Sequence, residues 1–225
     1  MTLTLLNLLQ RIATVYDTLT HSPHDTVVIR AYAAFKTALL TQYRAIPYRV
    51  LFVDTDPYLD SADMFRKVEA SGILQVYTGG ELPENHPMHK PMHCPCCHSN
   101  AFTVVGCPDC GSEPIGRIGQ STPTYNHIFR AIHDALIHIP NRFSFGPVGE
   151  FKAFQAHAKM LVSPFGAQWA KGSWVGDSEA LRALATETLA QSARFNTIGN
   201  AKTFAPQKAC LLPDSLIVEA LELEV

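Results

Sequence analysis

Hydrophobic residues recur at helical spacing over most of the chain, and only short segments have the run of apolar residues typical of strands. Near the start, an apolar stripe with a period of about 3.6 residues predicts an amphipathic helix within residues 1–21. Its members are Leu5, Leu8, Leu9, Ile12, Tyr16 and Leu19. A second helix is predicted within residues 21–47, with Asp25 as its cap and Pro47 beyond its end.

The next part of the chain alternates between strand and helix. The segments "YRVLFVD" and "ILQVYTG" read as strands, and between them "SADMFRKVEASG" has a capping serine and a terminal glycine. Further helices are predicted at about 124–138, 148–162 and 178–195, followed by a last helix or strand in the tail. These elements predict an α+β fold that is mostly helical, with a helical core, a small mixed β-sheet and an inserted zinc ribbon.

A change of composition divides the chain into three parts. Residues 79–123 are dense in Gly, Pro, Cys and His, and they interrupt the helical pattern. We therefore expect an N-terminal part over 1–78 with helices and a βαβ segment, an insert over 79–123, and a helical part rich in His and Glu over 124–225 that packs on the first.

Charge and hydropathy narrow the classes of function. The net charge of −2 gives no global positive field, so binding to nucleic acid would need a local patch. Arg11 and Asp17 interrupt the first apolar run, and no basic leader or cleavage site precedes it. The sequence therefore predicts a cytoplasmic protein with no membrane partner.

Two pairs of cysteines form the strongest motif in the chain. "CPCC" contains Cys94 and Cys97, and "CPDCG" contains Cys107 and Cys110, each in the spacing C-x-x-C. Each pair can form a tight turn whose backbone N–H groups point at the thiolates, and four thiolates make a closed tetrahedral site. The pairs resemble zinc-ribbon knuckles over about residues 92–115, which implies a structural zinc ion. Cys96, His93 and His98 could each replace one of the four ligands.

The insert has two interpretations. Metal binding could hold together a segment too small to bury a core of its own. Alternatively, the ribbon could contact nucleic acid or a partner protein through a thin basic flank that consists of His89, Lys90, His93 and Arg117.

Histidines within an apolar helical pattern are the second candidate site. "HIFRAIHDALIHIP" places His133 among apolar residues, and His138 follows five positions later. On an α-helix that spacing separates two side chains by about 140°. Pro140 disfavours helical geometry at Ile139, so we expect the helix to end at His138 and its last turn to loosen toward a shared ion. Packing of two ordinary core histidines is the alternative.

Later helices can supply further ligands. Glu150 and His157 lie on one face of the helix at 148–162, and Glu187 lies on the helix at 178–195. Helices that each contribute a His or a carboxylate can converge on one ion. Glu187 and Glu150 are alternative carboxylate ligands. His157 is a candidate fourth ligand or general base. Asp134 either orients the histidines or is a solvated charge.

The segment "HDALIHIP" with the later "TET" resembles the H-D-x-x-G-H-x-P and T-V-E motifs of the pterin-dependent aromatic amino-acid hydroxylases. In that family two histidines and a glutamate hold non-haem iron. The resemblance implies iron ligation by His133, His138 and Glu187, although Ile137 stands where the family has glycine.

A broader pattern covers most of the chain. The order "FRAIHD…H", "GE..A…H" and "ETLAQ" resembles a family of uncharacterised proteins encoded by bacteriophages. The resemblance implies a phage protein, cytoplasmic in the host cell or associated with the virion.

Two classes of function follow. The first is a mononuclear metal enzyme, oxygenase-like with Fe²⁺ or hydrolytic with a second Zn²⁺, in which Glu150 or His157 moves protons with Asp134 beside the metal. The second is a non-enzymatic phage accessory or virion protein whose ribbon binds nucleic acid or protein.

Overall fold

The computed structural model describes residues 1–80, 82–94, 96, 97, 99, 107, 109, 110, 123–162, 178–198 and 206–225, together with the backbone of two short strands at 168–170 and 173–175. It divides into two compact units. Unit 1 comprises residues 1–35, 81–87 and 144–225, and unit 2 comprises residues 36–80 and 88–143. Residues 81–87, which the sequence analysis placed in the insert, thus belong to unit 1.

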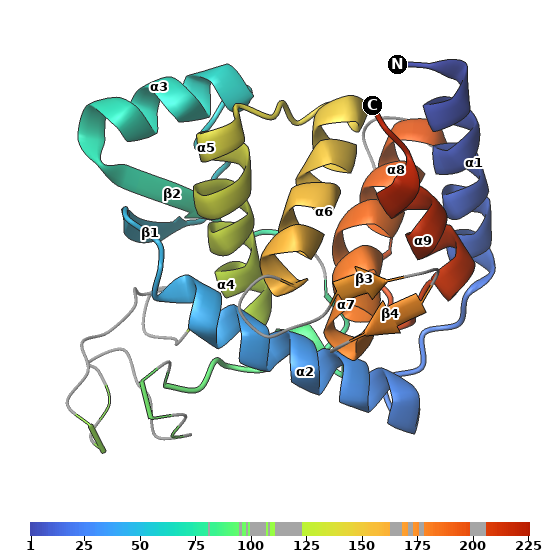
Figure 1. Cartoon of the computed structure of the whole chain (residues 1–225). Helices are drawn as coiled ribbons and strands as arrows, with labels where there is room; N and C mark the ends of the chain where they lie inside the picture. Colours follow the sequence, from blue (N-terminus) through green and yellow to red (C-terminus); the bar gives the residue numbers. More distant parts are fainter. Residues whose placement is uncertain are drawn as a thin grey trace. The chain divides into compact units, whose positions relative to one another are not determined.

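Unit 1 is built from helices that lie side by side (Figure 1). Helix α1 (Leu3–Thr18) packs against α8 (Gln191–Thr197), and α6 (Pro147–Val162) packs against α7 (Ser178–Ala185) and α8. Helix α9 (Asp214–Glu222) contacts α7. The apolar stripe predicted in the first helix is buried, which confirms the prediction; its buried members are Leu5, Leu8, Leu9, Ile12 and Tyr16.

Lys208 binds the C-terminal end of α1. Lys208 Nζ donates hydrogen bonds to the backbone oxygens of Tyr16, Asp17 and Leu19, at 3.0, 3.1 and 2.9 Å. A cation at this point is favourable because the last carbonyls of a helix carry partial negative charge.

Strands β3 (Gln168–Ala170) and β4 (Ser173–Val175), which the sequence pattern did not predict, pair antiparallel in unit 1.

Unit 2 contains the predicted strand, helix and strand. Strands β1 (Arg49–Val53) and β2 (Ile73–Tyr77) pair in parallel, with Arg49 opposite Ile73. Helix α3 (Ser61–Ser71) connects them, and it is capped by Asp60 in place of the predicted serine. Gly72 ends this helix in the left-handed conformation, as predicted. The core of unit 2 consists of Val50, Met64, Val68, Leu74, Val76, Ala131, Ala135 and Ile139.

Helix α2 (Thr26–Tyr43) begins at the predicted Asp25 cap, whose carboxylate accepts a hydrogen bond from the N–H of Val27 at 2.7 Å. Its residues up to Phe35 belong to unit 1, and the rest belong to unit 2. The elements together confirm the predicted mostly helical α+β class. Among the described helices, none is long and apolar enough to cross a membrane.

The helix of the histidine segment differs from its prediction. Helix α4 (Tyr125–Ile132) continues as a π-helix, η2 (His133–His138), and then as a last α-turn, α5 (Ile139–Asn141). The predicted end at His138 is therefore wrong. Pro140 lies directly after the π-helical segment, at the second residue of α5.

Candidate metal centres and a buried carboxylate

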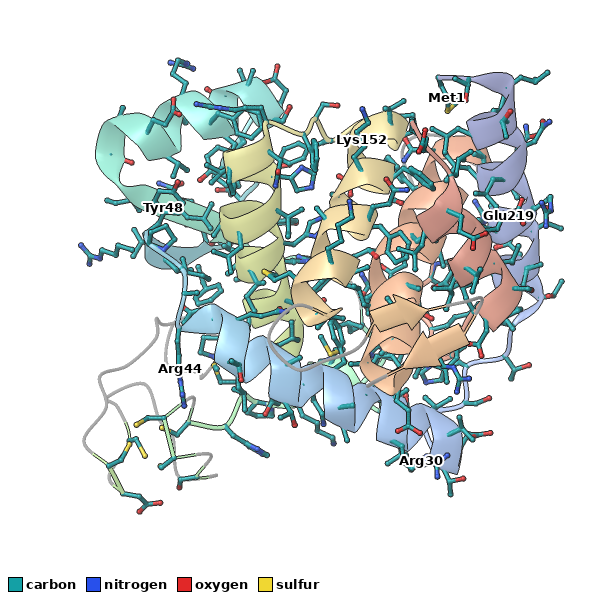
Figure 2. All side chains as sticks on the ribbon, viewed as in Figure 1. Met1, Arg30, Arg44, Tyr48, Lys152 and Glu219 are labelled. Carbon is teal, nitrogen blue, oxygen red and sulfur yellow. The ribbon has the colours of Figure 1, made fainter. Side chains whose placement is uncertain are left out.

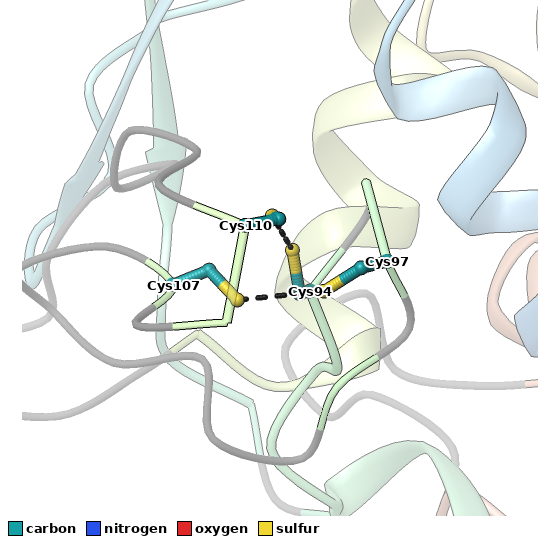
Figure 3. A group of neighbouring side chains, drawn as sticks. All are labelled: Cys94, Cys97, Cys107 and Cys110. Atoms are coloured by element: carbon teal, nitrogen blue, oxygen red, sulfur yellow. Dashed lines mark hydrogen bonds between the residues drawn. The ribbon is translucent and has the colours of Figure 1, made fainter.

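The two C-x-x-C pairs come together in unit 2, where four thiols face one another (Figure 3). Cys94 Sγ lies 3.6 Å from Cys110 Sγ, and Cys97 Sγ lies 3.5 Å from Cys107 Sγ. All four sulfur atoms lie within 4.8 Å of one another. Around a tetrahedral zinc ion with Zn–S bonds of about 2.3 Å, neighbouring sulfurs are about 3.8 Å apart. The cluster therefore has the dimensions of a metal site and could hold a metal ion.

The backbone around the first pair is arranged as in a metal-binding knuckle. The N–H of Cys96 donates to Cys94 Sγ at 3.3 Å, and the N–H of Cys94 donates to the oxygen of Ser99 at 2.9 Å. A donated N–H group stabilises a thiolate and lowers its repulsion for neighbouring thiolates. The knuckle is also tied to the end of α2, because Arg44 donates to the backbone oxygen of Cys96 at 3.0 Å (Figure 2).

The part of the insert that carries the cysteines is closed at its base in unit 2. The N–H of Met92 donates to the oxygen of Pro123, and the N–H of Tyr125 donates to the oxygen of Lys90, at 3.0 and 3.1 Å. These bonds form an antiparallel bridge between Pro91 and Thr124. Cys96 and His93, which were alternative ligands, are not members of the four-thiol group. His98 and Arg117 lie outside the described residues.

The π-helix η2, in unit 2, brings His133 and His138 together. Its backbone has an i to i+5 hydrogen bond, in which the N–H of Ile139 donates to the oxygen of Asp134. A π-helix has about 4.4 residues per turn, so side chains five positions apart diverge by only about 50° rather than about 140°. As a result His133 Nε2 and His138 Nε2 are 3.0 Å apart, with His138 fully buried.

The second nitrogen of His138 has a defined partner. His138 Nδ1 lies 2.9 Å from the backbone oxygen of Phe143, an acceptor, so Nδ1 carries the proton and Nε2 presents a lone pair. This arrangement orients metal-binding histidines in many proteins. Two imidazoles bound side by side to one octahedral ion have nitrogen atoms about 3.0 Å apart. A hydrogen bond from His133 to His138 has the same length, so the pair fits both metal binding and packing.

Glu187 lies in a different environment, inside unit 1. It belongs to the second π-helix, η3 (Thr186–Ala190), in which the hydroxyls of Thr186 and Thr188 donate to backbone oxygens four residues earlier. Such bonds compete with the α-helical ladder and favour its distortion. The carboxylate accepts hydrogen bonds from Tyr32 Oη at 2.5 Å and from Gln191 Nε2 at 3.0 Å.

His86 completes this buried group. Its Nε2 lies 3.4 Å from Glu187 Oε1, its side chain is fully buried, and its ring meets the edge of Tyr32 at a centroid distance of 5.3 Å. Burial, followed by the charge of Glu187, raises the pKa of Tyr32 well above its ordinary value. Tyr32 therefore remains a hydrogen-bond donor at neutral pH.

The two glutamines beside Glu187 have a fixed orientation. Because a carboxylate only accepts, Gln191 must present its amide N–H to it, and its oxygen then accepts from Gln207 Nε2 at 3.2 Å. This chain of donors orients Glu187. The sequence analysis missed Tyr32 and His86 as partners of Glu187, since they are distant along the chain and neither belongs to a recognisable motif.

The remaining predicted residues are distributed over both units. Glu150, half-buried, and His157, fully buried, lie on α6 in unit 1. Asp134 lies half-buried on η2 in unit 2. The pKa of Tyr58 is raised by burial, and the charge of Asp134 contributes to the rise. Asp134 is therefore close to Tyr58, a neighbour that the sequence did not indicate.

Comparisons with known proteins add no family to this description. No protein-family model, no curated protein and no solved structure matches the chain.

Proposed function

We propose that this chain is a metalloprotein with two metal centres: a structural zinc ion at the four cysteines, and a mononuclear metal ion with a catalytic role at His133 and His138. The four-thiol cluster is the observation that carries the proposal. Four sulfur ligands favour zinc among common divalent metals, and a closed set of thiolates is typical of structural sites.

The second centre is supported by the geometry of the histidine pair. A π-helix is rare and is found frequently at functional sites. Here it places two imidazole nitrogens 3.0 Å apart, and Phe143 fixes the tautomer of one of them. A carboxylate ligand would complete the set. The sequence offers Glu150 and Glu187 as candidates for this ligand.

Such a centre supports one of two reactions. Zn²⁺ would supply an acidified water for hydrolysis, and Fe²⁺ would supply open positions for dioxygen. In both cases His157 or Glu150 is the proton carrier that the sequence offers, with Asp134 as a group that orients the histidines.

Metal analysis of the purified full-length protein tests the proposal. We expect about two metal equivalents in the wild type, with one lost in Cys107→Ala and the other lost in His133→Ala or His138→Ala. His24→Ala is the matched control, because His24 is exposed and outside both groups. One equivalent of zinc that is lost only in the cysteine variant would remove the catalytic centre from the proposal.

Two further measurements identify the carboxylate ligand and the atoms around the metal. Glu150→Gln and Glu187→Gln are compared for loss of the second equivalent, and X-ray absorption distinguishes sulfur from nitrogen and oxygen neighbours. If neither glutamate variant changes the metal content, the proposed set of two histidines and a carboxylate is wrong.

A binding role for the ribbon is the second candidate function. Burial lowers the pKa of Lys36, and the nearby positive charge of Lys90 lowers it further. Two cations side by side favour an anionic partner such as nucleic acid, in keeping with the suggested phage accessory role. A salt-dependent gel shift with mixed DNA and RNA tests it, with Lys36→Ala and Lys90→Ala expected to weaken the shift. No shift at low salt would leave only the metal-centre proposal.

A further inference from the structure

The zinc-ribbon segment contains one thiol more than a tetrahedral site uses. Cys94, Cys97, Cys107 and Cys110 make up the four-thiol group, and Cys96 stands between the first two. Cys96 is exposed, and its N–H donates to Cys94 Sγ at 3.3 Å, which in turn lies 3.6 Å from Cys110 Sγ. This geometry, with a side-chain hydrogen bond between the thiols of Cys96 and Cys110, places Cys96 at the cluster. Five cysteines are therefore gathered where four would bind the metal.

The cluster is also exposed unevenly. Cys94 and Cys107 are buried, with 0% and 4% of their surface accessible, whereas Cys97 and Cys110 are exposed. A small reagent can therefore reach Cys110 and its neighbour Cys96 before it reaches the buried pair. A cysteine bound to zinc is a thiolate, and an accessible thiolate beside a second thiol is the arrangement found in oxidation-sensitive sites.

We propose that Cys96 is a resolving thiol that makes the zinc site sensitive to hydroperoxides. The Cys110 thiolate attacks one oxygen of hydrogen peroxide, the O–O bond breaks, and the other oxygen leaves as hydroxide, which takes up a proton from solvent to become water. Cys110 is now a sulfenic acid. The Cys96 thiol then attacks its sulfur, which forms the Cys96–Cys110 disulfide and releases a second water. Two thiols lose two electrons, and the peroxide gains them.

The consequence is loss of the metal. A disulfide sulfur is not a thiolate ligand, so three cysteines remain and the closed tetrahedral set is broken. The oxidised residue Cys96 is also the one that ties the knuckle to the end of α2, since Arg44 donates to its backbone oxygen at 3.0 Å. The inference rests on the proposed zinc ion at the four cysteines.

The test uses full-length wild type, Cys96→Ser and Cys210→Ser exposed to hydrogen peroxide. Zinc release is followed with a chromogenic chelator, and the first disulfide is identified by alkylation and peptide mass spectrometry. We expect the wild type to release zinc as the Cys96–Cys110 linkage appears, and Cys96→Ser to release it about tenfold more slowly, because the intramolecular thiol is missing. Cys210 is buried in unit 1, so Cys210→Ser is expected to behave as the wild type.

Three results would overturn the inference, and they are separable from the proposal on which it rests. Equal release rates in wild type and Cys96→Ser, or a first disulfide without Cys96, would show that Cys96 does not resolve the oxidised thiol. Cys96→Ser purified without zinc would show that Cys96 is a ligand, which leaves the metal centre in place. Wild type purified without zinc would contradict the metal centre itself.

Discussion

The hydrogen bond between Tyr32 and Glu187 gives a quantitative test of the buried group in unit 1. Tyr32 Oη is 2.5 Å from Glu187 Oε1, and the tyrosine is fully buried. Tyr32→Phe removes the donor and changes the packing by only one oxygen atom. The carboxylate then keeps its bond from Gln191 and its contact with His86.

The magnitude follows from the type of bond. A buried hydrogen bond to a charged group contributes about 1.5–3 kcal/mol, and a bond between neutral groups contributes about 1 kcal/mol. Tyr16 is the matched control, because its buried hydroxyl contacts backbone only; it donates to the oxygen of Pro206 at 2.9 Å and accepts from the N–H of Lys208 at 3.2 Å. We therefore expect Tyr32→Phe to lower the free energy of unfolding by about 1.5–3 kcal/mol, and Tyr16→Phe, which loses two neutral bonds, to lower it by about 2 kcal/mol. The coupling of each tyrosine to Glu187 distinguishes the two.

Urea denaturation of the single variants and of the double variants with Glu187→Gln provides the assay. The coupling energy between Tyr32 and Glu187 is expected to be about 1.5–3 kcal/mol, and that between Tyr16 and Glu187 below about 0.5 kcal/mol. A coupling between Tyr32 and Glu187 that is near zero, like that expected for Tyr16, would refute the reasoning that this bond is strong because it is buried and reaches a carboxylate.

Three further predictions concern other positions. Burial lowers the pKa of His127 to about 4. As the pH falls below about 6.5, the unfolded chain therefore binds a proton at this position before the folded protein does, and the folded state loses stability. Relative to His127→Gln, the wild type should lose about 2 kcal/mol of unfolding free energy between pH 7.5 and 5, measured by denaturation at each pH. At Gly149 a Cβ would lie 1.9 Å from the backbone oxygen of Ser144, so Gly149→Ala should lower the free energy of unfolding by more than about 2 kcal/mol. Gly72 has φ +67° and open space around it, so Gly72→Ala should lower it by about 1 kcal/mol. Equal melting temperatures of the two variants would contradict this prediction. Lys208→Met removes three bonds to the end of α1 and should cost about 1–2 kcal/mol, with faster amide exchange in the last turn of α1.

Local patterns in the sequence determined the helices, the parallel pair of strands and the cysteine cluster. The buried stripe of α1, the Asp25 cap of α2 and the left-handed Gly72 after α3 were all predictable, because periodicity and capping act within a few residues. The C-x-x-C spacing likewise restricts each pair of thiols to one turn. The predicted metal at His133 and His138 and its carboxylate stay predictions.

Tertiary structure decided how the polar groups are paired. The sequence places His133 and His138 about 140° apart on an α-helix, and only the π-helical backbone of η2 brings their nitrogens to 3.0 Å. Glu187 meets Tyr32, which is 155 positions away in the chain, because the buried carboxylate needs donors and the packing of unit 1 supplies them. Spacing along the chain sets what a turn can do locally, but the partners of a buried polar group depend on which distant helices pack around it.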